Sequence, residues 1–161
     1  MEYGQGVRQS TKIIAGDRRL TMHLMGLWQG VRHGANSCAP AEDFFAVLPE
    51  DLWADCCVVE MADDGSWEVS RMGGNIARRS GVPDAPIKID DLPPRSLMAT
   101  SVCEIADAKR TGAPILNEGE TEDETGRSAL FRSILLPLAD NEGRIVQYLA
   151  GARCRVRRED A

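Results

Sequence analysis

The sequence predicts an α+β domain with a five-stranded antiparallel sheet, short central helices and an amphipathic helix near the N-terminus. The stretch FRSILLPLADNEGRIVQYLAGARCRV, residues 131–156, has the form of two apolar strands around a tight turn. A helical stripe and an earlier pair of strand-like segments precede it. Strands on both sides of a helical middle are typical of an α+β domain whose sheet is antiparallel.

The N-terminal helix is predicted by apolar residues at helical spacing. The stripe consists of Leu20, Leu24, Leu27, Trp28 and Val31, and a glycine at position 34 provides a stop signal. A shorter helix is expected over residues 41–48, before a proline. Residues 1–18 are polar and predict a flexible lead-in, residues 19–50 a helical cap, and residues 51–157 the core.

The middle of the chain alternates strand, helix and loop signals. Residues 52–61 predict a buried strand, and residues 67–73 predict its hairpin partner across the turn ADDGS. Asn75 is placed to cap a short helix over residues 75–81. Four prolines between residues 82 and 95 predict a loop. A helix over residues 96–110, a short strand over 113–119 and an acidic loop over 120–127 follow.

The turn of the closing ribbon sets its predicted register. Asp140 to Gly143 suits a type I turn whose last residue is a glycine in the left-handed region, which predicts a three-residue hairpin with a glycine bulge. This register pairs Leu138 with Val146, Leu136 with Tyr148, Ile134 with Ala150 and Arg132 with Ala152. Because side chains alternate along a strand, a slip of one residue would exchange the faces of one strand.

Both faces of the ribbon carry large apolar side chains. On this register one face holds Leu130, Arg132, Ile134, Leu136, Leu138, Val146, Tyr148, Ala150 and Ala152. The other holds Phe131, Leu135, Pro137, Ile145 and Leu149 among Ser133, Gln147 and Arg153. Both are too apolar for water, so we expect the central helices to cover one face and the N-terminal helix the other.

Composition excludes several classes of function. The chain has 161 residues, 43% of them hydrophobic, which is enough for one packed core. A formal charge of −6 argues against nucleic acid or an anionic membrane as partner. No signal peptide and no membrane-spanning stretch is recognisable, so we expect a cytoplasmic protein without membrane insertion. The five cysteines lack metal-site spacing, and buried free thiols are expected.

The order of elements resembles the PAS domain. The ending FRSILLPLADNEGRIVQYLAGA is similar to the last hairpin of an alphaproteobacterial PAS subgroup. WEVSRMGGNIARRSG is similar to its second strand and following helix, and LWQGVRHGANSCAPAEDFFAVLPEDLWADCCVVEM to its opening. Together these stretches cover roughly residues 24–156. The acidic ETEDETGR departs from the subgroup's usual pattern.

The resemblance implies a stand-alone sensory or regulatory module that acts through protein–protein interaction and does not catalyse a reaction. A homodimer and a signalling partner such as a histidine kinase or response regulator are implied with it. A cavity between sheet and central helices would bind a ligand through Arg132, Ile134, Tyr148, Met72, Asn75 and Ile76. The expected interface consists of Leu20, Leu24, Leu27, Trp28, Val31, Phe131 and Leu135.

Arg132 and Asn75 also have purely structural interpretations. Arg132 either pairs a ligand's carboxylate or phosphate, pairs an internal acid such as Glu104 or Asp107, or reaches solvent past its aliphatic stem. Asn75 either caps its helix or marks a helix start that presents backbone N–H groups to an anion.

No cofactor and no metal is expected. His23 and His33 lie on the N-terminal helix, outside the candidate cavity, and would not ligate haem there. The helix NIARRSG lacks the cysteine of a light-oxygen-voltage flavin photosensor. The acidic residues between 118 and 124 lack the regular spacing of a calcium loop.

Two alternatives remain open at the level of sequence. One is a purely structural dimerisation module whose cavity is filled by side chains. The other is a small hydratase-like or isomerase-like enzyme with an apolar cavity, which needs an acid–base pair, and Glu60, Glu68 or Asp55 are the strand candidates.

Overall fold

The computed structural model describes residues 18–157. The predicted lead-in over residues 1–18 therefore lies outside the described residues, apart from the arginine that begins the first helix. The elements are, in order, α2 Arg18–Val31, α3 Ala41–Val47, α4 Glu50–Trp53, β1 Cys56–Met61, β2 Trp67–Met72, α5 Gly74–Ser80, β3 Ile87–Lys88, the 3-10 helix η2 Ile89–Asp91, α6 Leu97–Val102, α7 Ile105–Thr111, β4 Ile115–Glu122, β5 Ser128–Ala139 and β6 Ile145–Val156.

The strands form one antiparallel sheet in the order β3-β2-β1-β6-β5-β4. The predicted α+β class is confirmed, with an N-terminal helix, two strands, short helices and three closing strands. The sheet has six strands instead of the predicted five, because the two-residue β3 pairs with β2 inside the segment that was expected to be a loop.

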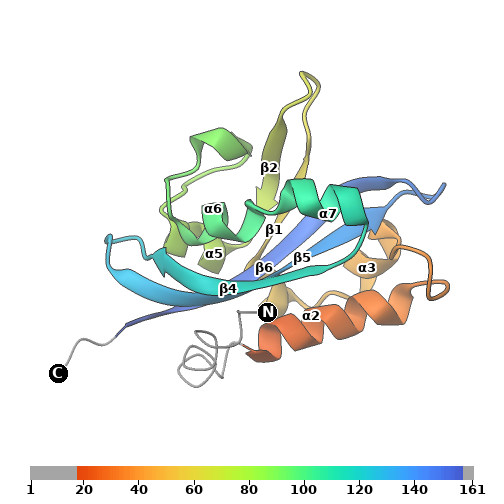
Figure 1. The fold of residues 1–161 in the computed structure, drawn as a ribbon, viewed down its shortest axis with the longest axis horizontal. Coiled ribbons are helices and arrows are strands. Elements are labelled where there is room, and N and C mark those ends of the chain that lie inside the picture. Colours follow the sequence, from red (N-terminus) through yellow and green to blue (C-terminus); the bar gives the residue numbers. More distant parts are fainter. Residues whose placement is uncertain (1–17, 158–161) are drawn as a thin grey trace.

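The closing hairpin of β5 and β6 lies between helices on both sides (Figure 1). On one side the helices from α5 to α7 pack against Phe131, Leu135, Tyr148, Ala150 and Ala152, and we call this the inner cluster. On the other side α2 packs against Ile134, Leu136, Leu138 and Leu149, and we call this the outer cluster. The prediction that both faces of the hairpin are covered is therefore confirmed.

The predicted turn is confirmed, but the register beyond it is wrong. The Gly143 N–H donates to the Asp140 carbonyl at 3.1 Å, and Gly143 has a φ of +83°. A bulge follows the turn. Ala139 pairs with Ile145, but the next pair joins Leu138 to Gln147, so that Val146 has no partner on β5. Every later pair is shifted by one residue, which gives Leu136 with Leu149, Ile134 with Gly151 and Arg132 with Arg153.

The bulge exchanges the faces of β6 relative to β5. Tyr148 therefore lies with Phe131 and Leu135 under the central helices, whereas Ile134 lies with Leu149 under α2. The face predicted to line a cavity is thus divided between the two sides of the sheet.

Other differences are local. Leu52 was expected in a strand but lies in α4, which begins after Pro49, and β1 starts only at Cys56. The helix expected over residues 96–110 is two helices, α6 and α7. Strand β4 continues to Glu122, into the segment predicted as an acidic loop. No helix among the described residues is long and apolar enough to span a bilayer.

Helix α5 begins differently from the prediction. Gly73 occupies its N-cap position without a side-chain cap, and Asn75 lies inside the helix. A Cβ atom on Gly73 would lie 2.1 Å from the carbonyl oxygen of Trp53, so only glycine fits this close approach. The predicted capping role of Asn75 is therefore wrong.

Candidate functional site

The space expected to be a ligand cavity is occupied by side chains. Ile76, Leu97 and Met98 are almost completely buried against the sheet, and Tyr148 fills the same layer from β6. Met72 is half-buried at the margin of this cluster. Three of the six predicted ligand-binding residues therefore belong to the core: Ile76 and Tyr148 are buried in it, and Met72 packs against it.

Arg132 and Ile134 lie on the opposite side of the sheet from the predicted cavity. Ile134 belongs to the outer cluster under α2. The Arg132 guanidinium reaches Glu118 of β4, with 2.8 Å between Nη2 and Oε1, and both side chains are nearly buried at 13% and 12% exposure. The predicted placement of both residues in the cavity is wrong, because a second bulge at Val146, beyond the predicted glycine bulge, shifts the register of β6.

The internal acid beside Arg132 also differs from those expected. Asp107 pairs instead with Arg110 on its own helix, at 2.7 Å between Oδ1 and Nη2. Glu118 is the directly opposed residue on the neighbouring strand, so the pair follows from strand register.

The predicted interface residues are used within the chain. Leu20, Leu24 and Trp28 are buried in the outer cluster, and Leu27 and Val31 pack against it. Phe131 and Leu135 are buried in the inner cluster, on the other side of the sheet from α2. A partner cannot contact these buried side chains while α2 stays on the sheet, so this set does not form an open docking surface.

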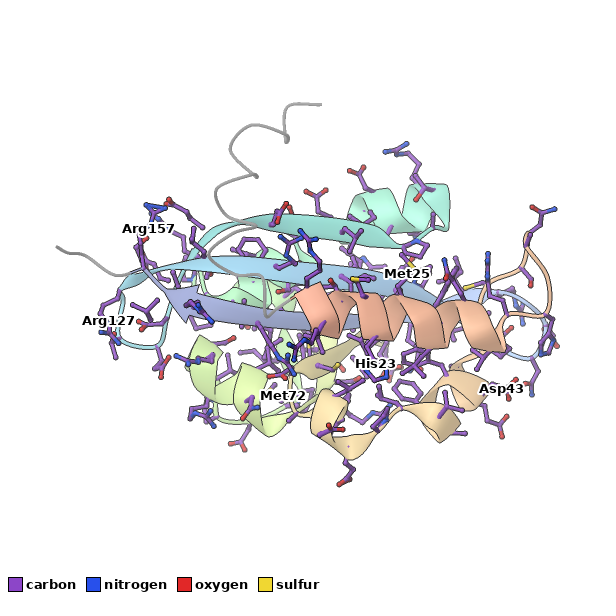
Figure 2. All side chains as sticks on the ribbon, turned by 90° about the horizontal axis from the view of Figure 1, so that it is seen from below. His23, Met25, Asp43, Met72, Arg127 and Arg157 are labelled. Carbon is purple, nitrogen blue, oxygen red and sulfur yellow. The ribbon has the colours of Figure 1, made fainter. Side chains whose placement is uncertain are left out.

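Helix α2 lies across β5 and β6, and Figure 2 shows Met25 on its β4 side and His23 on the side of α3 and α4. Gly151 of β6 permits this close packing, because a Cβ atom there would lie 2.3 Å from Leu24 Cδ1.

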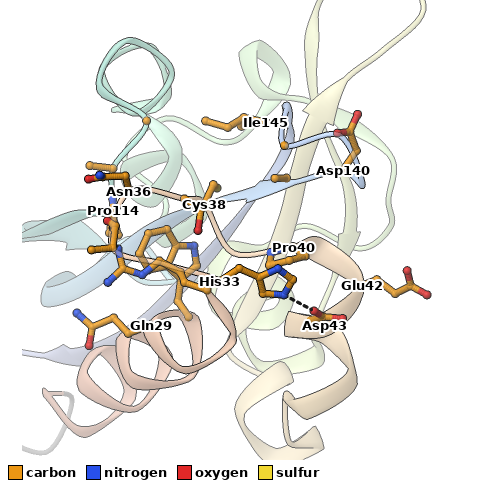
Figure 3. A pocket seen from close by; sticks show the side chains of 18 of the residues that line it. Gln29, His33, Asn36, Cys38, Pro40, Glu42, Asp43, Pro114, Asp140 and Ile145 are labelled. Carbon is orange, nitrogen blue, oxygen red and sulfur yellow. Dashed lines mark hydrogen bonds and ion pairs between the residues drawn. The ribbon is translucent and has the colours of Figure 1, made fainter.

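A cleft of about 880 Å³ lies at the C-terminal end of α2 (Figure 3). Its walls come from five segments: the end of α2, the loop before α3, the start of α3, residues 111–114 between α7 and β4, and the β5–β6 turn. We call it the α2 cleft. Its volume lies in the range of sites for small organic ligands.

The α2 cleft has a mixed lining. The Arg32 guanidinium lies 5.0 Å from the centre of the Trp28 ring and donates to the Ala35 carbonyl at 2.9 Å. His33 Nε2 lies 3.5 Å from Asp43 Oδ2, as Figure 3 shows. The cleft therefore presents an aromatic edge, a guanidinium group, an imidazole and carboxylates, which suits a ligand with both polar and apolar parts.

Cys38 also lines the α2 cleft, and its thiol donates to the Pro137 carbonyl at 3.1 Å. Burial raises the pKa of this thiol, although a hydrogen bond from the Ala39 backbone and the charge of Arg32 act in the opposite direction. A thiol with a raised pKa is less ionised at neutral pH, so Cys38 is less nucleophilic than a fully exposed cysteine.

Asn75 and Ile76 line a second, smaller pocket of about 190 Å³ at the end of the sheet. The backbone N–H groups of Asn75 and Ile76 both donate to the Ala54 carbonyl, at 2.9 and 3.1 Å. These donors are therefore engaged and do not face an anion, which contradicts the interpretation of this helix start as an anion site.

The three carboxylates considered for catalysis lie outside the inner cluster. Asp55 Oδ2 accepts from Arg153, Glu60 Oε1 accepts from Gln147, and Glu68 lies 3.9 Å from the Lys88 ammonium group. Among residues 18–157, no three His, Cys, Asp or Glu side chains are grouped so that they could hold a metal ion.

The sequence matches no protein-family model and no curated protein. Among solved structures it is similar to the PAS domain of a protein from Colwellia psychrerythraea, with 13% identity and a TM-score of 0.46 over 64% of this chain and 88% of that chain. It is similar to the Rhodobacter sphaeroides LOV protein, with 12% identity and a TM-score of 0.45 over 86% and 68%. The PAS domain of Bordetella pertussis BvgS gives 13% identity and a TM-score of 0.43 over 73% and 87%.

These solved structures transfer no ligand or activity to this chain. By its order of elements and its antiparallel sheet between a lead-in helix and short central helices, the chain has a PAS-like α+β fold.

Proposed function

We propose that this chain is a regulatory module of the sensory type, which acts on a protein partner and uses α2 as its output element. The proposal is carried by the lining of the α2 cleft. Part of this lining belongs to α2, and part belongs to loops next to the sheet, namely residues 111–114 before β4 and the β5–β6 turn. A ligand bound there contacts both parts, so its binding energy depends on how α2 lies on the sheet.

The docked position of α2 is stabilised chiefly by apolar burial. Leu20, Leu24 and Trp28 are buried against the sheet. Burying each such side chain contributes about 1.5–3 kcal/mol, so α2 stays docked in the absence of a second molecule. To move α2, a ligand or partner must bind the protein with displaced α2 more tightly than the protein with docked α2. The difference in binding free energy must be comparable to the free energy that this burial contributes.

A homodimer and a signalling partner such as a histidine kinase or a response regulator belong to this proposal through the resemblance to PAS domains. The exposed side of α2 offers a contact point that does not require undocking, since Met22 has 64% of its surface exposed. A hydratase-like enzyme would need an acid–base pair. Asp55, Glu60 and Glu68 each interact instead with Arg153, Gln147 or Lys88, and this favours regulation.

The proposal is tested by filling the α2 cleft. Ala113 is exposed and lines the cleft, so Ala113→Trp should fill it without disturbing either cluster. Ala46→Trp, at an exposed position of α3 that does not line the cleft, is the matched control. We expect native mass spectrometry to detect a co-purifying small molecule in the parent and in the Ala46→Trp variant, and none in the Ala113→Trp variant.

Hydrogen exchange of α2 gives the second readout. We expect slower or faster exchange of the α2 amides in the loaded protein than in the Ala113→Trp variant, because the ligand contacts the helix. Identical exchange and an identical mass spectrum in all three proteins would contradict a cleft-gated sensor.

A second candidate is a structural dimerisation module. It is favoured by the side chains that fill the layer between the sheet and the central helices. Sedimentation velocity separates the two: a dimer that forms without ligand, and equally in the Ala113→Trp variant, supports the structural module.

A further inference from the structure

We propose that the pocket of about 190 Å³ between α5 and the end of β6 binds a small oxyanion through arginine side chains. We call it the arginine pocket. It lies apart from the α2 cleft and shares no lining residue with it, so the inference does not rest on the proposed function.

The pocket lies where β6 continues past the first residue of its antiparallel neighbour β1. The first residue of β1, Cys56, pairs with Gly151, and the Ala152 N–H still donates to the Asp55 carbonyl at 3.0 Å. Beyond this point β6 runs on to Val156 with only β5 as its strand partner. Helix α5 lies beside the resulting gap, and residues of both elements line it.

Three arginines line this small space. Arg78 and Arg79 come from the last turn of α5, and Arg153 comes from β6. Asp55 is the one carboxylate among the pocket's lining residues, so the lining has a formal charge of +2. Such a concentration of guanidinium groups in a chain of net charge −6 favours an anionic ligand.

Asp55 organises the cations. Its Oδ2 accepts from Arg153 Nε at 2.9 Å, and its Oδ1 accepts from Asn75 Nδ2 at 3.3 Å. Asn75 Oδ1 in turn accepts from Arg78 Nη2 at 3.2 Å. Both Asp55 oxygens are thus used by neighbouring donors, and the nearly buried carboxylate orients Arg153 and, through Asn75, Arg78.

The guanidinium groups keep donors for a ligand. The terminal nitrogens of Arg153 have no partner among the described residues, and a third of its side chain is exposed. Within residues 18–157, the Arg79 guanidinium pairs with Glu124, at 3.7 Å between Nη1 and Oε1, and both side chains of this pair are partly exposed. Such surface pairs are weak, so an oxyanion can compete for Arg79 in fork geometry.

The apolar floor and the small volume of the arginine pocket limit which ligands it can bind. Ile76, Leu97 and Ala152 are each about 1% exposed and belong to the inner cluster. The volume accommodates an oxyanion with a few carbon atoms and is below the usual range for nucleotide-sized or drug-sized ligands. The shared chemistry is therefore phosphate or a short carboxylate.

Titration of the full chain with inorganic phosphate, and separately with succinate, tests the proposal. Nitrogen–proton NMR follows the arginine Nε signals at constant ionic strength, with chloride as the reference ion. We expect saturable shifts that centre on Arg79 and Arg153 for at least one of the two ions. Succinate saturation alone assigns a carboxylate site, and phosphate saturation alone assigns a phosphate site.

Matched variants separate the pocket from general charge effects. Arg79→Gln leaves the Asp55 network intact and should weaken binding about tenfold. Arg110→Gln removes an exposed arginine of α7 outside the pocket and should bind as the parent does. Non-saturating shifts with both ions, or equal weakening in the two variants, would overturn the proposal.

Arg153→Gln adds a check on the role of Asp55. It should weaken binding more than Arg79→Gln, and circular dichroism must show that the variant is folded before it is compared. Ala113→Trp, which fills the α2 cleft, should leave oxyanion binding unchanged. Failure of the proposed function and failure of this inference are therefore distinguishable.

Discussion

Trp28 donates its indole N–H to the carbonyl oxygen of Pro137 at 2.7 Å, and this buried bond joins α2 to β5 across 109 residues of sequence. The Cys38 thiol donates to the same oxygen. Since the Trp28 ring also fills the outer cluster, this contact fixes where the end of α2 lies on the sheet and shapes one wall of the α2 cleft.

Removal of the indole donor should loosen α2. Trp28→Phe keeps an aromatic ring in the outer cluster but loses the hydrogen bond, so we expect the free energy of unfolding to fall by about 1–2 kcal/mol. Urea denaturation followed by circular dichroism measures it. Trp53→Phe, at a half-buried position of α4, is the control and should lose less. Equal losses would contradict a special role for the Pro137 contact.

The pair between Arg132 and Glu118 should behave as a coupled unit. Arg132→Leu and Glu118→Leu each remove one member of this nearly buried ion pair, and we expect each to lower the free energy of unfolding by about 1–3 kcal/mol. The double variant should lose less than the sum of the two. Additive losses would show that the two residues act independently.

The exposed pair of Arg110 and Asp107 provides a comparison for this measurement. Arg110→Leu should change the free energy of unfolding by less than about 0.5 kcal/mol, since exposed ion pairs contribute little.

Acid should weaken the β4–β5 turn through Asp123. Burial of this carboxylate opposes its ionisation, but the Thr125 hydroxyl, the N–H groups of Arg127 and Thr125 and the Arg127 charge outweigh burial and lower the pKa to about 2. A pKa below the ordinary 3.8 means that the ionised form stabilises the folded state. This contribution is complete above about pH 4 and is lost as the pH falls through 2.

Asp123→Asn should therefore be less stable than the parent at pH 6, and the difference should shrink between pH 4 and pH 2. Denaturation midpoints at several pH values measure this effect. Asp63→Asn, at an exposed position of the β1–β2 loop, is the control. A difference that grows toward pH 2 would contradict a stabilising ionised Asp123.

The sequence predicted the layers of the fold better than their register. The stripe on α2 and the two apolar faces of the hairpin are direct consequences of burial, so Leu24 and Leu136 were placed correctly in the core. The bulge at Val146 shifts one strand by a single residue relative to the predicted register. No local pattern distinguishes it from a regular strand.

The two pockets were harder to predict, because their walls come from segments far apart in the chain. Arg153 and Asp55 are separated by 98 residues, and nothing near either one indicates the other. The side chain of Asn75, and not the backbone N–H group that the sequence pointed to, contacts the residues that line the arginine pocket.

The cysteines should differ in reactivity according to their burial. Cys56 and Cys57 are neighbours in β1, and because side chains alternate along a strand, Cys56 lies in the outer cluster and Cys57 in the inner cluster. Burial raises the pKa of Cys57 to about 12 and that of Cys56 well above its ordinary value. Cys103 is exposed, although partial burial and the charge of Glu104 also raise its pKa.

We therefore expect iodoacetamide at pH 8 to label Cys103 first, and to label Cys56 and Cys57 only in urea. Peptide mass spectrometry at increasing reaction times measures the order. Early labelling of Cys57 in the folded protein would contradict the packing of the inner cluster.

The approach of Leu24 to Gly151 gives the sharpest test of how α2 sits on the sheet. An added Cβ at Gly151 would lie 2.3 Å from Leu24 Cδ1, and Leu24 is completely buried and cannot move aside freely. We expect Gly151→Ala to lower the free energy of unfolding by about 1–3 kcal/mol. Leu24→Ala should lower it by about 2–5 kcal/mol through the cavity it leaves.

The double variant should lose clearly less than the sum, because the added methyl group occupies part of the space that Leu24 vacates. Gly26→Ala is the control on the same helix: nothing lies within 4 Å of its added Cβ, so it should gain up to about 1 kcal/mol from helix propensity. Hydrogen exchange of α2 should rise in Gly151→Ala and fall back in the double variant. Strictly additive losses, with unchanged exchange, would mean that α2 does not pack against β6 at Gly151.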